Sequence, residues 1–138
     1  MGRRGTFGRL AIAALVAGSV ACGSHAAQGP RVVGRADAEA MVRGLRGEVV
    51  RVDRIASKRM TVSELRHGQD AIELGPRPAA LLVWVVAVAG ELRPDRALSS
   101  PPRSWGVYVY DATSGDTLAS DLGSNGGWPP YFDGLPDH

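Results

Sequence analysis

The side chains best suited to metal binding or catalysis in this chain are one cysteine, Cys22, and three histidines, His25, His67 and His138. No pair of them has the short spacing that zinc ligands need, and no second cysteine is available to complete a thiolate site. None of the histidines lies in a segment with a regular pattern, where a general base would be held in place. The sequence therefore predicts no metal site and no cofactor.

The aspartates of the C-terminal third are a second set of candidate ligands. The segment Asp111-x-Thr113-x-Gly115-Asp116 is partly similar to a calcium loop, which supplies alternating oxygen ligands and a distal acid. The same short side chains also fit a turn, because aspartate and serine bond to nearby backbone groups. We favour the turn for these residues. The complete set of acids is Asp111, Asp116, Asp121, Asp133 and Asp137.

Catalytic motifs are also missing. No segment reads Gly-x-Ser-x-Gly, the sequence that presents a hydrolase serine on a sharp turn. The glycine-rich stretch 123–127 is followed by Trp-Pro-Pro instead of by a helix, so it does not match a phosphate-binding loop. We therefore expect that the protein is not an enzyme.

Aromatic residues of the C-terminal third offer binding chemistry instead. They could form an exposed platform for a peptide, a glycan or a partner domain, since exposed aromatic patches mark interaction sites. The alternative is that the tail packs back over the sheet and buries its aromatic side chains as hydrophobic cover. The candidate partner-binding residues are Tyr108, Tyr110, Trp128, Tyr131 and Phe132, together with Trp105.

The N-terminal segment has the pattern of an export signal. Arg3, Arg4 and Arg9 form a positive region, and residues 10–21 then run without a charge. These residues would span about 18 Å as a helix, which is too short to cross a hydrocarbon core of about 30 Å. The length suits the apolar region of a signal peptide, so we expect residues 1–21 to be removed.

Small residues lead up to Cys22 in the segment Gly18-Ser19-Val20-Ala21-Cys22, which resembles the lipobox of bacterial lipoproteins. Ser19 departs from the family, which usually carries leucine there. The resemblance implies that Cys22 is lipidated and holds the protein on the extracytoplasmic face of the cell membrane, where two acyl chains give a durable anchor. An ordinary signal peptide, cleaved nearby, is the alternative. Residues 22–34 are then a tether.

The net charge changes once the signal is removed. Residues 1–21 hold three of the 16 basic residues and none of the 14 acidic ones, so the remaining chain has 13 basic and 14 acidic residues. This balance argues against nucleic acid as a partner, because nucleic-acid binding needs a concentrated basic surface.

The folded part is expected to begin near Arg35. Residues 37–46 have helical spacing of apolar residues, with Asp37 near the N-terminus and Gly47 after the C-terminus. Residues 48–57 suit a half-exposed strand with Val50 and Val52 on its buried face. A capping box at 61–64 predicts a short helix that ends near Gly68.

Two further segments complete the predicted sheet. Residues 79–89 are a continuous apolar run rich in valine, which predicts a central strand covered on both faces. Residues 105–119 alternate and then turn at Gly115, which predicts a hairpin with Val107 and Val109 on one face and the tyrosines on the other. The prediction is an α+β fold: an antiparallel sheet of three to five strands with one main helix packed on one face.

The order of these elements resembles small exported PepSY-like domains. Their last hairpin has a similar phrase, which is matched here by Asp111, Ala112, Gly115, Asp116 and Leu118. The resemblance covers residues 35–122 and leaves 123–138 as a tail rich in glycine, proline and aromatic residues. It implies a non-catalytic binding or regulatory module for a protein or peptide partner in the cell envelope. A cryptic envelope hydrolase and a passive structural or accessory lipoprotein are the alternatives.

Overall fold

The computed structural model describes residues 32–94 and 100–138. Its four strands form one antiparallel sheet in the order β1-β2-β3-β4, and helices pack on the sheet, so the predicted α+β class is confirmed. In chain order the elements are α1 (Arg35–Arg43), β1 (Val49–Thr61), α2 (Val62–Gly68), β2 (Leu82–Leu92), β3 (Arg103–Asp111), β4 (Thr117–Gly123) and the short 3-10 helix η1 (Phe132–Gly134).

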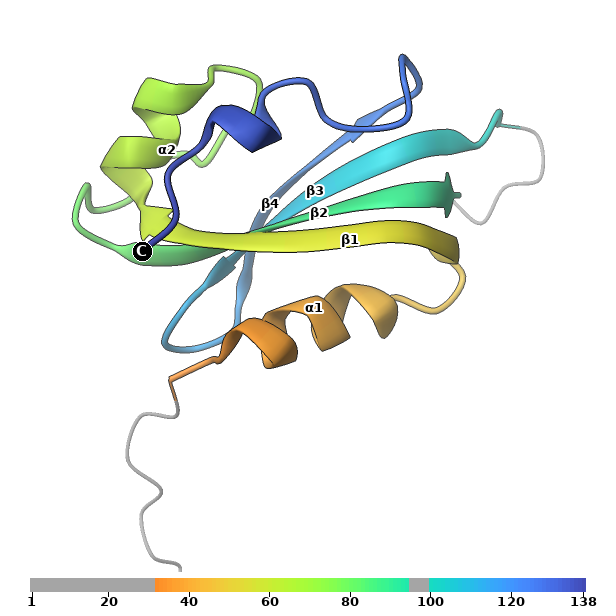
Figure 1. Ribbon diagram of the computed structural model, residues 1–138. Helices are drawn as coiled ribbons and strands as arrows, with labels where there is room; N and C mark the ends of the chain where they lie inside the picture. Colours follow the sequence, from red (N-terminus) through yellow and green to blue (C-terminus); the bar gives the residue numbers. More distant parts are fainter. Residues whose placement is uncertain (1–31, 95–99) are drawn as a thin grey trace, which may run out of the picture.

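The sheet carries a layer on each face. Figure 1 shows α1 along one face, and α2 with the C-terminal segment on the other. The α1-side cluster of buried residues comprises Ala38, Val42, Trp84, Val86, Val88, Leu92, Tyr108, Tyr110 and Ala112. The α2-side cluster comprises Met60, Val62, Leu65, Ile72, Leu74, Val83, Val85, Ala87, Trp105, Val107, Val109, Phe132 and Leu135.

Strand β2 is the central strand that the apolar run predicts. It pairs with β1 on one side and with β3 on the other. Val83 and Val85 face the α2-side cluster, whereas Trp84 and Val86 face the α1-side cluster. Because both faces are covered, a run without polar alternation is stable here.

Strand β1 differs from the prediction in length and in orientation. It continues to Thr61, and the side chains of Val50 and Val52 are 55% and 36% exposed, so their predicted burial is wrong. Register shifts fall between Val49 and Arg51 and again between Val52 and Arg54. Each bulge adds a residue that breaks the period-two alternation, which is why the simple pattern fails.

Helix α1 begins two residues earlier than predicted and ends earlier as well. Gly34 is its N-cap, and the Asp37 carboxylate accepts a hydrogen bond of 3.1 Å from the Gly34 amide. The helix stops at Gly44 instead of running through it, and Gly47 lies in the following turn with φ of 93°. Glycine lowers helix propensity, so the interior glycine becomes the end of the helix.

The two locally specified features are confirmed. Thr61 and Glu64 form a reciprocal capping box at the start of α2, which ends at Gly68. The β3–β4 hairpin turns where predicted, because the Asp111 carboxylate accepts hydrogen bonds from the Thr113 and Ser114 amides at 2.7 and 3.0 Å. These bonds are those of a turn built by a short acidic side chain.

Contacts of the fold begin at Val33, within the segment expected to be a tether. The Val33 amide donates to the Ala112 carbonyl at 2.9 Å, and its own carbonyl accepts from the Trp84 indole at 2.7 Å. At the other end, residues 123–138 are part of the same unit, since Phe132 and Leu135 lie in the α2-side cluster.

Candidate functional site

The sheet separates the aromatic residues that the sequence suggested as one surface. Tyr108 and Tyr110 lie in the α1-side cluster, whereas Trp128, Tyr131 and Phe132 lie on the opposite face. Tyr108, Tyr110 and Phe132 are only 3%, 2% and 1% exposed. An exposed aromatic platform is therefore wrong for these three residues, because their rings are needed as hydrophobic cover.

The two tyrosines of the α1-side cluster lie near one carboxylate. The Tyr108 hydroxyl donates to Glu48 at 2.9 Å, and burial followed by this hydrogen bond raises the pKa of Tyr108 far above its ordinary value. Burial, followed by the charge of Glu48, raises the pKa of Tyr110 to about 12. Within the described residues the Tyr110 hydroxyl has no hydrogen-bond partner. Both side chains are held neutral, which suits packing and does not suit a general base.

The aromatic residues of the tail pack against each other and against β1. Trp128 and Phe132 meet edge to face at 5.4 Å, and the Arg54 guanidinium lies 3.7 Å from the centre of the Trp128 ring. The Tyr131 hydroxyl donates to Asp121 at 2.8 Å. Trp128 and Tyr131 keep part of their surface exposed, so they are the remaining members of the predicted aromatic set that solvent or a partner can reach.

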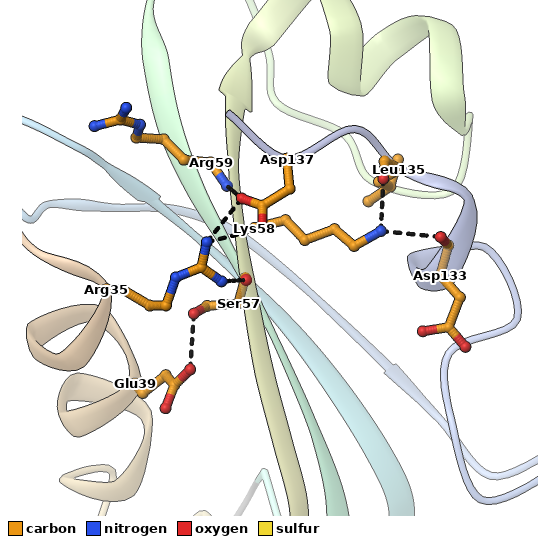
Figure 2. Close-up of polar contacts among 8 residues, drawn as sticks. All are labelled: Arg35, Glu39, Ser57, Lys58, Arg59, Asp133, Leu135 and Asp137. Carbon is orange, nitrogen blue, oxygen red and sulfur yellow. Dashed lines mark hydrogen bonds and ion pairs between the residues drawn. The ribbon is translucent and has the colours of Figure 1, made fainter.

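Figure 2 shows how polar contacts fasten the end of the tail along β1. Lys58 donates to the carbonyls of Asp133 and Leu135, the first at 2.9 Å. The Asp137 carboxylate accepts from the Arg35 guanidinium at 2.9 and 2.8 Å, and from the Arg59 amide at 3.0 Å. Residues from α1, β1 and the tail therefore meet at one place on the edge of the sheet.

The outer edge of β1 is closed at this place. The Arg59 carbonyl accepts from the His138 amide at 3.0 Å, and the Ser57 carbonyl accepts from the Arg35 guanidinium. Partial burial alone would raise the pKa of Asp137, but hydrogen bonds from Arg35 and Arg59 outweigh it and hold this pKa below its ordinary value. A charged carboxylate thus caps backbone groups that would otherwise face outward.

The opposite edge of the sheet, along β4, is open. Backbone groups on a strand alternate between its two neighbours, so a strand row fixes which residues point outward at each edge. Ser57 points away from β2, and its row runs through Val86, Tyr108 and Ser120. Ser120 therefore points its N–H and C=O away from β3. The same alternation gives Leu122 the same orientation.

No other described segment hydrogen-bonds to the backbone of Ser120 or Leu122. Ser120 is exposed, and Leu122 is half-buried against the α1-side cluster. Helix α1 contacts β1 and β2, so it leaves this side of the sheet without a helical cover. The edge of β4 is the candidate functional site, and the sequence analysis did not identify it.

Hollows in the surface of the described residues do not assemble a catalytic set. One of about 480 Å³ lies between the start of α1 and the hairpin turn, and its polar side chains are Asp37, Thr113 and Ser114. Another, of about 300 Å³, contains Arg51, whose hydrogen bond with Asp53 raises its pKa and keeps it a cation. Neither hollow contains a histidine.

Several predicted residues lie outside the description or away from the edges. The predicted signal peptide (1–21), the lipidation residue Cys22 and His25 are outside the described residues. His67 is exposed on α2, and His138 pairs with Glu64 at 2.8 Å. Within 32–94 and 100–138, no helix is long and apolar enough to cross a membrane, and no cluster of side chains could hold a metal ion.

Comparison of the chain with protein-family models, with curated proteins and with solved structures finds no match.

Proposed function

We propose that this protein is a lipid-anchored module on the extracytoplasmic face of a bacterial membrane, and that it binds a protein or peptide partner without catalysis. The pattern of residues 1–22 supports the address, and the resemblance of the closing hairpin to PepSY-like domains supports the binding role. The observation that carries the binding role is the difference between the two edges of the sheet. One is fastened by the tail, and the other presents unpaired backbone groups at Ser120 and Leu122.

The anchor would keep the binding domain close to the bilayer. Eleven residues separate Cys22 from Val33, the first residue with a contact to the fold. Even a fully extended chain of this length reaches only about 36–40 Å. A lipid on Cys22 would therefore restrict the domain to partners at the membrane surface or in the nearby envelope.

The anchor is tested by replacing Cys22 with alanine in cells that process lipoproteins. We expect the wild-type chain to gain the mass of its acyl groups and to partition into a detergent phase, whereas Cys22→Ala stays in the aqueous phase without added mass. Ser24→Ala is the matched control, since it changes a neighbouring small residue and leaves the thiol. Membrane attachment and mass that do not change in Cys22→Ala would contradict the lipid anchor.

The binding role is tested by crosslinking intact membranes and isolating the chain through an affinity tag. A specific partner should be recovered with the wild-type protein and lost when the tagged chain is unfolded before crosslinking. Recovery of nothing above the background of an untagged strain would contradict the role.

A further inference from the structure

We propose that the open edge of β4 takes up an extended, basic segment of the partner as a fifth strand of the sheet. This inference rests on the proposed binding function and names its site and the chemistry of its partner. Strand addition supplies affinity through main-chain hydrogen bonds and specificity through alternate side chains.

The first argument is the unused hydrogen-bonding capacity of β4. Ser120 and Leu122 are two residues apart and both point outward, so one extended segment can reach the N–H and C=O groups of both. The strand of seven residues is long enough for such a segment, at about 3.3 Å per residue.

The second argument is that the other edge is protected and this one is not. Two bulges interrupt β1, and the tail with Arg35 occupies the outward groups of Ser57 and Arg59. Bulges, charges and covering segments are the usual means by which proteins block unwanted strand pairing. On β4 the register shift lies near Leu118, before the two outward-pointing residues.

The third argument is charge. Residues 104–123, which form most of the hairpin, contain Asp111, Asp116 and Asp121 and have no lysine or arginine. The Tyr131 hydroxyl occupies one oxygen of Asp121 and leaves the carboxylate charged. A side chain on an added strand lies about 5 Å from its neighbour across the pair, so a lysine or arginine there would pair with Asp121.

The side chains that flank this edge favour an added strand with apolar residues. Leu122 belongs to the partly buried residues of the α1-side cluster, whereas Leu118 and Ala119 belong to those of the α2-side cluster. Apolar residues on the added strand would extend both clusters. A basic segment with alternating β-branched residues is therefore the segment that fits.

The test uses the full chain in detergent and a labelled peptide, acetyl-Thr-Val-Lys-Val-Arg-Val-Thr-amide, with binding followed by fluorescence anisotropy. Replacing Ser120 with proline removes an outward N–H and leaves the β3–β4 ladder intact, because that N–H is not used inside the sheet. We expect Ser120→Pro to raise Kd at least about tenfold. Ser120→Ala, which keeps the N–H, should stay within about twofold. Equal binding by Ser120→Pro would overturn the proposal.

A second measurement does not depend on the folding of a variant. Two peptides are N-methylated on alternate amides, so that one blocks the amides facing β4 and the other blocks those facing away. We expect only one of them to lose binding to the wild-type chain. Loss by both or by neither, or equal affinity for a peptide with glutamate in place of lysine and arginine, would refute strand addition by a basic segment.

Two outcomes separate this inference from the function on which it rests. A partner captured equally by wild-type and Ser120→Pro chains would leave the binding role in place and overturn the site. Light scattering that shows a dimer of the full chain, lost in Ser120→Pro, would assign the edge to a second copy and also overturn the peptide proposal. Capture of no partner by either chain would contradict the binding role itself.

Discussion

The attachment of the tail should depend on one buried ring far more than on its ion pair. Phe132 is 1% exposed in the α2-side cluster, and removing such a side chain costs about 3–5 kcal/mol. The side chains of Arg35 and Asp137 are 49% and 38% exposed, and exposed ion pairs contribute about 0–1 kcal/mol. We therefore expect Phe132→Ala to lower the free energy of unfolding several times more than Asp137→Asn does.

Urea unfolding of the full chain, followed by circular dichroism, measures both losses if the slope with urea stays constant. Val50→Ala is the control, because this side chain is 55% exposed and its truncation should change stability by less than about 0.5 kcal/mol. Hydrogen exchange at the Arg59 amide should also speed up in Phe132→Ala, since its acceptor is on the tail. A larger loss in Asp137→Asn, or a loss below about 1 kcal/mol in Phe132→Ala, would refute the packing of the tail on the sheet.

Two further predictions concern α2 and the β1–β2 bulge. Hydrogen bonding with the Thr61 backbone, and then with His138, lowers the pKa of Glu64 from 4.5 to about 2, so its contribution is present above pH 4.5 and is lost as pH falls toward 2. Glu64→Gln keeps the cap but cannot titrate, and urea midpoints from about pH 5 to 2 should fall less steeply than in the wild type; parallel profiles would contradict this. A Cβ on Gly90, where φ is 154°, would lie 1.8 Å from the Arg51 carbonyl oxygen. Gly90→Ala should cost at least about 1–3 kcal/mol in urea unfolding, whereas Gly127→Ala, with open space around it, should cost little; equal losses would be the contrary result.

Local patterns in the sequence predict the elements that depend on neighbouring residues. The capping box at Thr61 and Glu64 specifies the start of α2, because both partners lie within one turn. The apolar run specifies β2 as a central strand, since only burial on both faces makes such a run stable. The alternation around Val107 and Tyr108 correctly assigns each to its own face of the sheet.

Helix α1 and strand β1 show where local pattern fails. The predicted helix included Gly44, but backbone capping at Gly34 and Gly44 sets the ends of α1 instead. Alternation along 48–57 predicted burial of Val50 and Val52, and two bulges reverse this outcome. A bulge depends on how the partner strand β2 pairs, so its position does not appear in the spacing of apolar residues along β1.

The sequence by itself determined that Tyr108 and Tyr110 share one face of a strand, and that the tail is rich in aromatic residues. Only the tertiary structure decided that the sheet lies between these two groups, so that they do not form one surface. It also decided that Asp137, 102 residues after Arg35, closes one edge and leaves Ser120 unpaired at the other. Such contacts depend on the three-dimensional path of the chain, which residue spacing along the sequence does not encode.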